Sequence, residues 1–300
     1  MTYFRIFKQL TFILVWILCV LAITEITLRI LGNFYSRKPV LDEISDTRVF
    51  TILCFGDSFT YGWGVDVRDS YPKQLETMLN NGNLNMRFKV FNLGVPGSNS
   101  SQQLKYLEDV LNKYKRPDLV IILTGANDCW NLADSNIDKF INKDQGKFDL
   151  IGIKFRIFLS NLRIYKMVKI TLLNLKGKTP ESEIDPFTQI PRYENIDEDI
   201  LKNLLEYNLT QIVNLAKSHN VKIILQNYPR GDLYGDNMIQ KVALRLGVPF
   251  IDNFATFNKK LKEVDFRDLF LYDNTHPNVR GYALMAEAIY KKIAENMLNK

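Results

Sequence analysis

Short apolar runs alternate with longer amphipathic stretches from residue 48 to residue 300. The runs predict strands at 49–56, 88–94, 117–125, 221–229 and 248–253. Stretches with apolar residues three and four positions apart predict helices at 71–81, 100–114, 195–219, 235–247 and 277–298. Strands that alternate with helices predict a parallel sheet covered by helices on both faces, with ligands bound beyond the carboxyl ends of the strands. Pro277 is expected at the first position of the last helix.

The amino terminus has the pattern of a membrane-targeting helix. Residues 9–24 carry no charge, and Arg5 and Lys8 precede them. The helical pattern continues beyond this run, where Glu25 and Arg29 stand four positions apart in the order that favours a helix ion pair. An uncleaved anchor therefore fits the segment better than a removable signal peptide.

The pattern divides the chain into an anchor or signal segment at 1–31, a polar linker at 32–47 and one domain at 48–300. An insertion at about 130–195 interrupts the alternation within this domain. With an uncleaved anchor, we expect the domain to lie outside the cytoplasm, in the periplasm or the extracellular space. The alternative is secretion after cleavage, for which only the small residues around 22–24 offer a site.

The insertion contains a basic stretch at 151–178, which has seven Lys and Arg residues and no Asp or Glu. Its apolar side chains have helix-compatible spacing: Phe155, Phe158, Leu159, Leu162 and Tyr165. Basic residues lie among them: Lys154, Arg163, Lys166 and Lys169. We favour a cap that packs on the core with a solvated basic rim. The alternative is a face that meets anionic lipid headgroups or an acidic glycan.

Composition narrows the function classes. The chain is 46% hydrophobic and 24% charged, which is ordinary for a globular protein. Its net charge of +6 is not gathered in a basic stretch with interleaved aromatic residues, so we expect no nucleic-acid partner. The three cysteines have no zinc-site spacing, and no metal or cofactor is expected. Cys54 is expected to be a small buried hydrophobe, with a Cys54–Cys129 disulfide as the alternative.

Chemistry-bearing residues gather at the predicted carboxyl edge of the sheet. Ser58 follows the first strand, Gly94 ends the second and Asn127 follows the third. Asp273 and His276 lie in a loop just before the last helix. Backbone N–H groups at Ser58 and Gly94, with the Asn127 amide, would supply three donors to an oxyanion.

A serine hydroxyl becomes nucleophilic when a base accepts its proton, and the chain offers two histidines as that base. His219 lies at a predicted helix end, where it is expected to interact with terminal carbonyl groups. His276 follows Asp273 by three residues, so the carboxylate can hold one ring nitrogen while the other faces Ser58. Pro277 restricts the backbone of His276 to extended geometry.

Four blocks carry a resemblance to the SGNH (GDSL) hydrolase superfamily: "GDSFT", "NLGVPG", "GAND" and "DNTHP". The resemblance covers roughly 48–128 and 265–300, and the leading apolar segment is similar to that of a bacterial, membrane-tethered branch. It implies a flavodoxin-like, three-layer α/β/α sandwich with a five-stranded parallel sheet. It also implies ester hydrolysis without a cofactor, with Ser58, His276 and Asp273 as the triad and Ser58, Gly94 and Asn127 as the oxyanion hole.

The predicted function is a serine esterase that cleaves an acyl or O-acetyl ester of a small molecule, lipid or glycan through an acyl-enzyme. One alternative is an O-acyltransferase that places the same acyl group on a cell-envelope glycan. Another is a catalytically silent envelope binding module, against which the presence of serine, base and carboxylate together counts.

Overall fold

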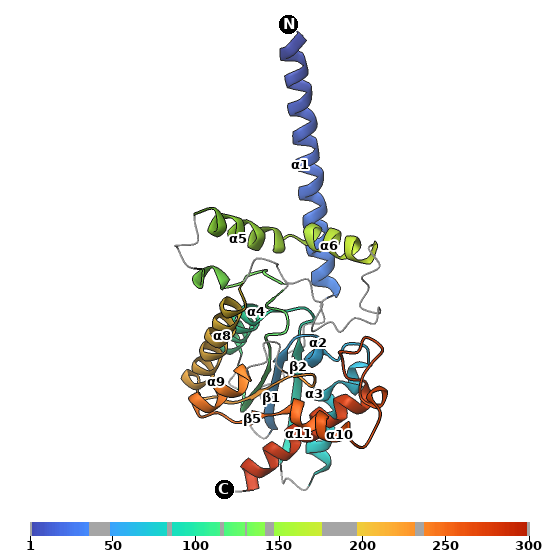
Figure 1. The fold of residues 1–300 in the computed structure, drawn as a ribbon, viewed down its shortest axis with the longest axis vertical. Helices are drawn as coiled ribbons and strands as arrows, with labels where there is room; N and C mark the ends of the chain where they lie inside the picture. The colour runs from blue at the N-terminus through green and yellow to red at the C-terminus, as the bar shows by residue number, and fades with distance from the viewer. Residues whose placement is uncertain are drawn as a thin grey trace.

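The computed structural model describes residues 2–35, 49–82, 86–114, 117–129, 131–141, 147–175, 197–231 and 237–298. At its centre lies a five-stranded sheet in the order β2-β1-β3-β4-β5 (Figure 1). The strands are β1 (Val49–Gly56), β2 (Arg87–Gly94), β3 (Leu119–Leu123), β4 (Lys222–Gln226) and β5 (Phe250–Ile251). All four pairings are parallel. The predicted parallel sheet is confirmed, and its strand order reverses between β1 and β3, where such sheets bind ligands.

Helices cover both faces of the sheet and make the predicted three-layer sandwich (Figure 1). One layer contains α3 (Tyr71–Asn81), α10 (Asn253–Lys260) and α11 (Val279–Leu298). The other contains α4 (Ser100–Lys113), α8 (Glu198–Ser218) and α9 (Met238–Leu246). Every residue of β3 is buried, as its uninterrupted apolar sequence requires. Cys54 in β1 is also buried, and Cys54 and Cys129 are both free, so the alternative of a disulfide is wrong.

The last helix begins two residues later than predicted. Pro277 lies in an antiparallel bridge with Phe270, which requires extended backbone at this point. The helix starts at Val279, and Asn278 caps it by accepting a hydrogen bond from the Gly281 N–H at 3.1 Å. Pro277 therefore ends the loop before the helix instead of starting the helix.

Three further helices lie at one end of the domain. α1 (Thr2–Tyr35) projects away from it, and α5 (Lys147–Ser160) and α6 (Arg163–Leu175) run across the line of α1 (Figure 1). The short helix α2 (Ser58–Tyr61) lies at the end of the sheet nearer to these helices, and the carboxyl terminus lies at the opposite end. The stretch Phe4–Leu31 of α1 is long and apolar enough to cross a membrane.

The structure describes parts of the predicted linker at 32–47 and of the predicted insertion at about 130–195. Helix α1 continues through Tyr35, so the first residues of the predicted linker are helical, and the rest of that linker lies outside the described residues. In the insertion, Ile153 and Ile157 pack against the core, as a cap would. Phe155 and Phe158, which the sequence assigns to a cap packed on the core, are each 58% exposed.

Candidate active site

Ser58 is held at the point where β1 turns into α2. Gly56 ends the strand, and a Cβ on it would overlap the side chain of Thr60 and the Leu123 carbonyl oxygen. Asp57 caps the helix, accepting a hydrogen bond from the Phe59 N–H at 3.0 Å. Ser58 is the first residue of α2, where a backbone N–H has no partner within the helix. The turn therefore presents both the hydroxyl and the N–H of Ser58 at the carboxyl edge of the sheet.

The structure brings the three predicted triad residues together. Ser58 Oγ lies 2.8 Å from His276 Nε2, although 218 positions separate the two residues in the chain. His276 Nδ1 lies 2.6 Å from Asp273 Oδ2. With Nδ1–H donating to the carboxylate, Nε2 is left to accept the proton of the serine hydroxyl.

The loop that carries Asp273 and His276 is fixed by its own hydrogen bonds. Asp273 Oδ1 accepts from the N–H groups of Thr275 and His276, each at 2.9 Å. The N–H of Leu271 donates to the carbonyl of His276 at 2.9 Å, and Asn274 takes the left-handed conformation with φ of 58°. One carboxylate oxygen thus shapes the loop while the other holds the imidazole.

The carboxylate stays charged in this setting. Burial works to raise the pKa of Asp273, but the hydrogen bond from the His276 ring, the electrostatic interaction with that ring and the backbone N–H groups of Thr275 and His276 outweigh burial and hold that pKa below its ordinary value. The side chains of His276 and Asp273 are only 17% and 15% exposed. A largely buried anion beside Nδ1 stabilises an imidazolium when His276 accepts a proton.

Two aromatic side chains flank the imidazole, and sequence reasoning did not single out either. The ring centroid of Phe59 lies 4.7 Å from that of His276, and the ring centroid of Trp63 lies 6.3 Å away. Phe59 is buried, whereas Trp63 is half exposed. Gly62 and Gly64, with φ of 88° and 79°, set the path of the loop that carries Trp63. In the sequence, the glycines on either side of Trp63 were the signal that this residue lies in a loop at the edge of the candidate site.

The predicted oxyanion donors differ in their surroundings. Gly94 lies against α2, and a Cβ on it would overlap the backbone of Thr60 and Tyr61. Its N–H donates to Asn92 Oδ1 at 3.0 Å. Asn127 Nδ2 donates to the carbonyl of Ser98 at 2.9 Å and, over a longer 3.3 Å, to Asp57 Oδ2.

Asp57 connects Asn127 to a residue that the sequence reasoning missed. Tyr228, directly after β4, donates its hydroxyl to Asp57 Oδ2 at 2.7 Å and accepts from the Ala126 N–H at 3.1 Å. Burial raises the pKa of Asp57 to about 6, against hydrogen bonds from Tyr228 and Phe59 that lower it. The polar "QNY", which begins with the last residue of the buried β4, was the available signal for this contact.

The other candidate groups lie apart from this cluster. His219 ends α8, and its Nδ1 lies 2.9 Å from the carbonyl of Leu215, as predicted for a helix-end histidine. Within the described ranges, no group of three or more His, Cys, Asp or Glu side chains is arranged to hold a metal ion.

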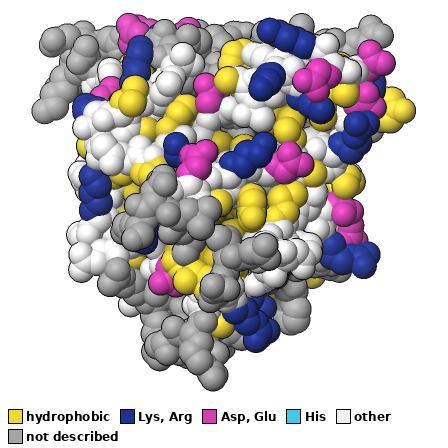
Figure 2. Space-filling view, turned by 90° about the horizontal axis from the view of Figure 1, so that it is seen from below, with side chains coloured by type: hydrophobic (Ala, Val, Ile, Leu, Met, Phe, Trp, Pro, Cys, Tyr) yellow, Lys and Arg dark blue, Asp and Glu magenta, His cyan; other side chains and the backbone are white. Residues whose placement is uncertain are grey.

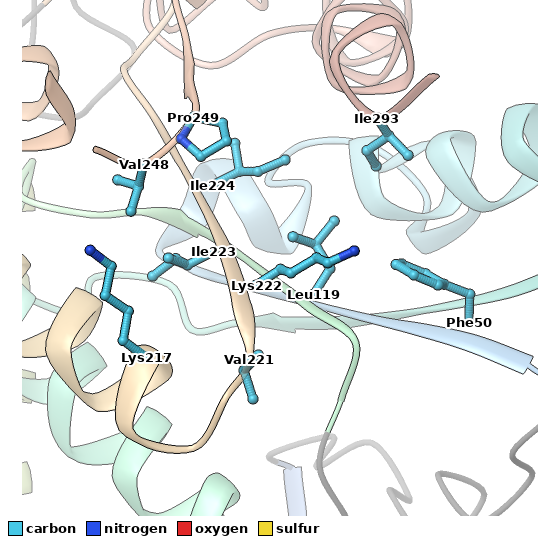
Figure 3. A pocket seen from close by; sticks show the side chains of 10 residues that line it. All are labelled: Phe50, Leu119, Lys217, Val221, Lys222, Ile223, Ile224, Val248, Pro249 and Ile293. Carbon is cyan, nitrogen blue, oxygen red and sulfur yellow. The ribbon is translucent and has the colours of Figure 1, made fainter. Parts of the chain in front are cut away.

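An apolar cavity of about 350 Å³ lies at the amino edge of the sheet, away from Ser58. Figure 3 shows the side chains that line it, at the start of the strands and around β4: Phe50, Leu119, Lys217, Val221, Lys222, Ile223, Ile224, Val248, Pro249 and Ile293. Because ligands of such sheets bind at the carboxyl edge, this cavity is not part of the candidate site.

Several solved structures resemble this fold. A G-D-S-L family lipolytic protein from Veillonella parvula is 15% identical, covering 80% of this chain and 96% of that one, with a TM-score of 0.48. An acetylxylan esterase from Geobacillus stearothermophilus is 20% identical, covering 81% and 93%, with a TM-score of 0.49. The psychrotrophic esterase EstA from a Pseudoalteromonas species is 18% identical, covering 84% and 100%, with a TM-score of 0.48.

Sequence comparison adds a partial relative and a family. An uncharacterized protein of Mycoplasma pneumoniae is 34% identical over 98 residues, which are 33% of this chain and only 11% of that protein. The model of the GDSL-like lipase/acylhydrolase family matches residues 54–284, a range that includes Ser58, Asp273 and His276. The chain therefore belongs to the GDSL-like lipase/acylhydrolase family and is a hydrolase that acts on ester bonds.

Proposed function

We propose that this hydrolase cleaves a carboxylic ester through a covalent acyl-enzyme on Ser58. The observation that carries the proposal is the continuous hydrogen-bonded line from Ser58 Oγ to His276 Nε2 and from His276 Nδ1 to Asp273 Oδ2, at 2.8 and 2.6 Å. Distances of this size allow a proton to pass from the nucleophile to the base as the nucleophile attacks.

In the first half-reaction, Ser58 Oγ attacks the ester carbonyl carbon while His276 Nε2 takes the hydroxyl proton. The tetrahedral intermediate then expels the alcohol, which leaves with the proton from His276, and Ser58 keeps the acyl group. In the second half-reaction, His276 takes a proton from water, and the resulting attack releases the acid and restores the Ser58 hydroxyl. Asp273 remains charged throughout and stabilises the imidazolium.

The oxyanion of each tetrahedral intermediate would be bound by the Ser58 N–H and by the Asn127 amide. The 3.3 Å contact of Asn127 Nδ2 with Asp57 is longer than its 2.9 Å hydrogen bond to the carbonyl of Ser98, and is the one that a substrate oxygen would replace. Gly94 would join as a third donor when its N–H leaves Asn92 Oδ1 for the substrate oxygen. Loss of one such donor costs roughly a hundredfold to a thousandfold in kcat.

Hydrolysis of p-nitrophenyl acetate by the detergent-solubilised full chain tests this proposal. We expect Ser58→Ala and His276→Ala to lower kcat by roughly a millionfold, because each removes a group that moves the proton or forms the bond. His219→Ala is the matched control, since it replaces the chain's second histidine, and it should leave the rate unchanged. Turnover that survives Ser58→Ala, or a fluorophosphonate that labels the parent elsewhere than Ser58, would overturn the assignment.

The second part of the proposal is that α1 stays attached as a membrane anchor and holds the domain outside the cytoplasm. Glu25 in α1 accepts hydrogen bonds from the N–H groups of Arg163 and Ile164 in α6, each at 3.0 Å. A cleaved signal peptide would leave these two groups without their partner. The intact mass of the protein extracted from membranes tests this: a mass lacking α1 would contradict the anchor.

A further inference from the structure

Helix α5 carries a second apolar face that the core does not use. Ile153 and Ile157 pack against the core on one side. Ile151, Phe155 and Phe158, spaced four and three residues apart, form a separate stripe and are 64%, 58% and 58% exposed. The two phenylalanine rings stack on each other, with centroids 6.5 Å apart. Large apolar side chains gathered in this way mark a surface that meets an apolar partner.

Helix α6 extends the same kind of surface. Met167, Val168 and Leu172 are about half exposed. Residues 151–175 of the two helices contain no Asp or Glu, while Lys154 in α5 and Arg163 in α6 are exposed basic side chains. Exposed apolar and basic side chains on the same helices are typical of helices that lie in the interface of a phospholipid bilayer.

The turn between α5 and α6 is clamped onto α1 by one ion pair. Glu25 and Arg29 are joined by a 2.8 Å hydrogen bond from Nε to Oε1. Glu25 also accepts the first two N–H groups of α6, and Arg29 Nη2 donates to the carbonyl of Asn161, just past the end of α5, at 2.9 Å. The carboxylate thus lies at the positive end of one helix dipole and the guanidinium at the negative end of the other.

The position of this clamp along α1 sets the level of both helices. Glu25 is the first charged residue after the uncharged run 9–24, so it marks where the uncharged part of α1 ends, within the apolar stretch Phe4–Leu31. Helices α5 and α6 run across the line of α1 at this level (Figure 1). For an α1 that crosses a membrane, helices so placed lie parallel to the bilayer at its boundary.

The opposite end of the molecule has a different surface. Figure 2 shows it with basic and acidic side chains interspersed and with hydrophobic side chains exposed between them. Such a mixed-charge surface is typical of a protein face in water. The exposed apolar stripes and the clamp onto α1 occur together at the other end.

We propose that α5 and α6 lie in the phospholipid headgroup region beside α1, with Ile151, Phe155, Phe158 and Leu172 inserted among the acyl chains. The exposed basic side chains of Lys154 and Arg163 contact headgroup phosphates. This role rests on α1 remaining attached, and it is independent of the ester chemistry at Ser58.

The test uses nitroxide labels on the full chain in nanodiscs of phosphatidylcholine and phosphatidylglycerol. Labels are placed singly at Phe155, Phe158 and Leu172, with Cys19→Ser removing the one exposed cysteine. Leu244, which is 73% exposed on α9, is the matched control position. Oxygen concentrates in the bilayer and a nickel chelate stays in water, so collision of each label with the two relaxants reports its surroundings.

We expect the three labels on α5 and α6 to collide more often with oxygen than with the nickel chelate, and the label at Leu244 to collide more often with the nickel chelate. A label on native Cys19 reports the insertion of α1 separately, so failure of the anchor is distinguished from failure of the interfacial helices. Labels at Phe155, Phe158 and Leu172 that meet the nickel chelate as Leu244 does would overturn the proposal. Labels shielded from both relaxants would also overturn it, and would indicate a protein partner or a second copy instead.

Discussion

The hydroxyl of Tyr228 links the serine turn to the predicted oxyanion donor. It holds Asp57, which caps the helix that begins with Ser58, and Asp57 in turn accepts from Asn127. The hydroxyl of Tyr228 acts on Asn127 through Asp57, so we assign it as a positioning residue. Its effect on catalysis would come through the orientation of the Asn127 amide.

Tyr228→Phe removes this hydroxyl and leaves the ring in place. We expect kcat to fall roughly tenfold to a hundredfold with little change in KM, because a displaced Asn127 weakens binding of the oxyanion more than binding of the ester. Steady-state kinetics with p-nitrophenyl acetate measures the split.

Tyr71→Phe is the matched control for that experiment. Tyr71 is equally buried, and its hydroxyl bonds to Thr60 and Gln226 instead of to Asp57. Both variants lose about 1–3 kcal/mol of stability, but only Tyr228→Phe should lose kcat to this extent. Equal kinetic losses in the two variants would contradict a positioning role for Tyr228.

The buried carboxyl of Asp128 makes the free energy of unfolding depend on pH. Its carboxylate accepts from Ser100 N and Ser100 Oγ, and burial raises its pKa from an ordinary value of 3.8 to about 7. Between these two values the folded state binds more protons than the unfolded state, so the carboxyl contributes less to stability as pH rises. The carboxyl must then ionise where burial penalises its charge.

Asp128→Asn removes this titration. We expect the midpoint of thermal unfolding of the variant, relative to the parent, to rise as pH increases from about 4 to about 7. Asp57 titrates in part of the same range, and its negative charge also raises the pKa of Asp128. The difference between the two proteins therefore contains the coupling between the two carboxyls as well as the titration of Asp128 itself. A difference that stays constant with pH would show that Asp128 does not titrate in this window.

At the scale of elements, the close contact between β2 and α2 fixes where Ser58 lies. Gly94→Ala would put a methyl group against the backbone of Thr60 and Tyr61. We expect α2 to shift, with a loss of about 1–3 kcal/mol in the free energy of unfolding and a fall in kcat. Chemical denaturation and esterase assays measure the two effects.

Gly152→Ala is the control for this substitution. Gly152 lies in α5, and apart from its chain neighbours and the backbone of its own helix, no described atom lies within 4 Å of the place that an alanine methyl group would take. The change should therefore raise stability by up to about 1 kcal/mol through helix propensity. Its kcat should equal that of the parent. A Gly94→Ala protein as active as this control would show that α2 is not fixed by the contact.

The sequence predicts best those helices and strands that are determined by residues close together in the chain. Strands β1 and β3 and helices α3 and α4 follow from apolar patterns and helix caps within a few residues. The apolar pattern predicts a strand over 248–253, but pairing with β4 ends at Ile251 because Asp252 caps the unpredicted helix α10. Residues 252 and 253 could either continue strand β5 or begin helix α10, and tertiary packing determines that they begin the helix.

The candidate site also contains residues that the sequence predicts and residues that it does not. Ser58, Asp273 and His276 could be named from sequence because their side chains have few alternative roles in that order. Tyr228 could not, because a tyrosine after a buried strand is ordinarily a core residue. The acceptor that Gly94 finds in Asn92 is also set by local side-chain geometry, which the spacing of motifs does not encode.

At the scale of the whole molecule, Glu25 joins α1 to the first turn of α6 through two hydrogen bonds. Glu25→Gln keeps the size of the side chain but replaces one of the two oxygens that accept N–H groups of α6. We expect faster amide hydrogen exchange at Arg163 and Ile164, because a helix N-terminus without its cap frays. Exchange of the full chain in nanodiscs, followed by mass spectrometry, measures this.

Glu287→Gln, at an exposed position on α11, is the control and should leave exchange in α6 unchanged. Unchanged exchange in the Glu25→Gln protein as well would mean that the turn is held to α1 by packing alone. The exchange of α9, at the other side of the domain, should be the same in all three proteins.

The placement of α2 at the end of the sheet nearer to α1 has a consequence for how substrate is found. If α1 anchors the domain in a membrane, as proposed, α2 with Ser58 lies on the side of the domain that faces the bilayer, and the enzyme meets substrates that diffuse in the plane of the membrane. Encounters would then depend on lateral diffusion and on how many ester molecules occupy each unit area of the bilayer. Diluting a lipid-borne ester with inert lipid should slow the reaction, whereas diluting the vesicles in buffer should leave the turnover of each enzyme molecule unchanged.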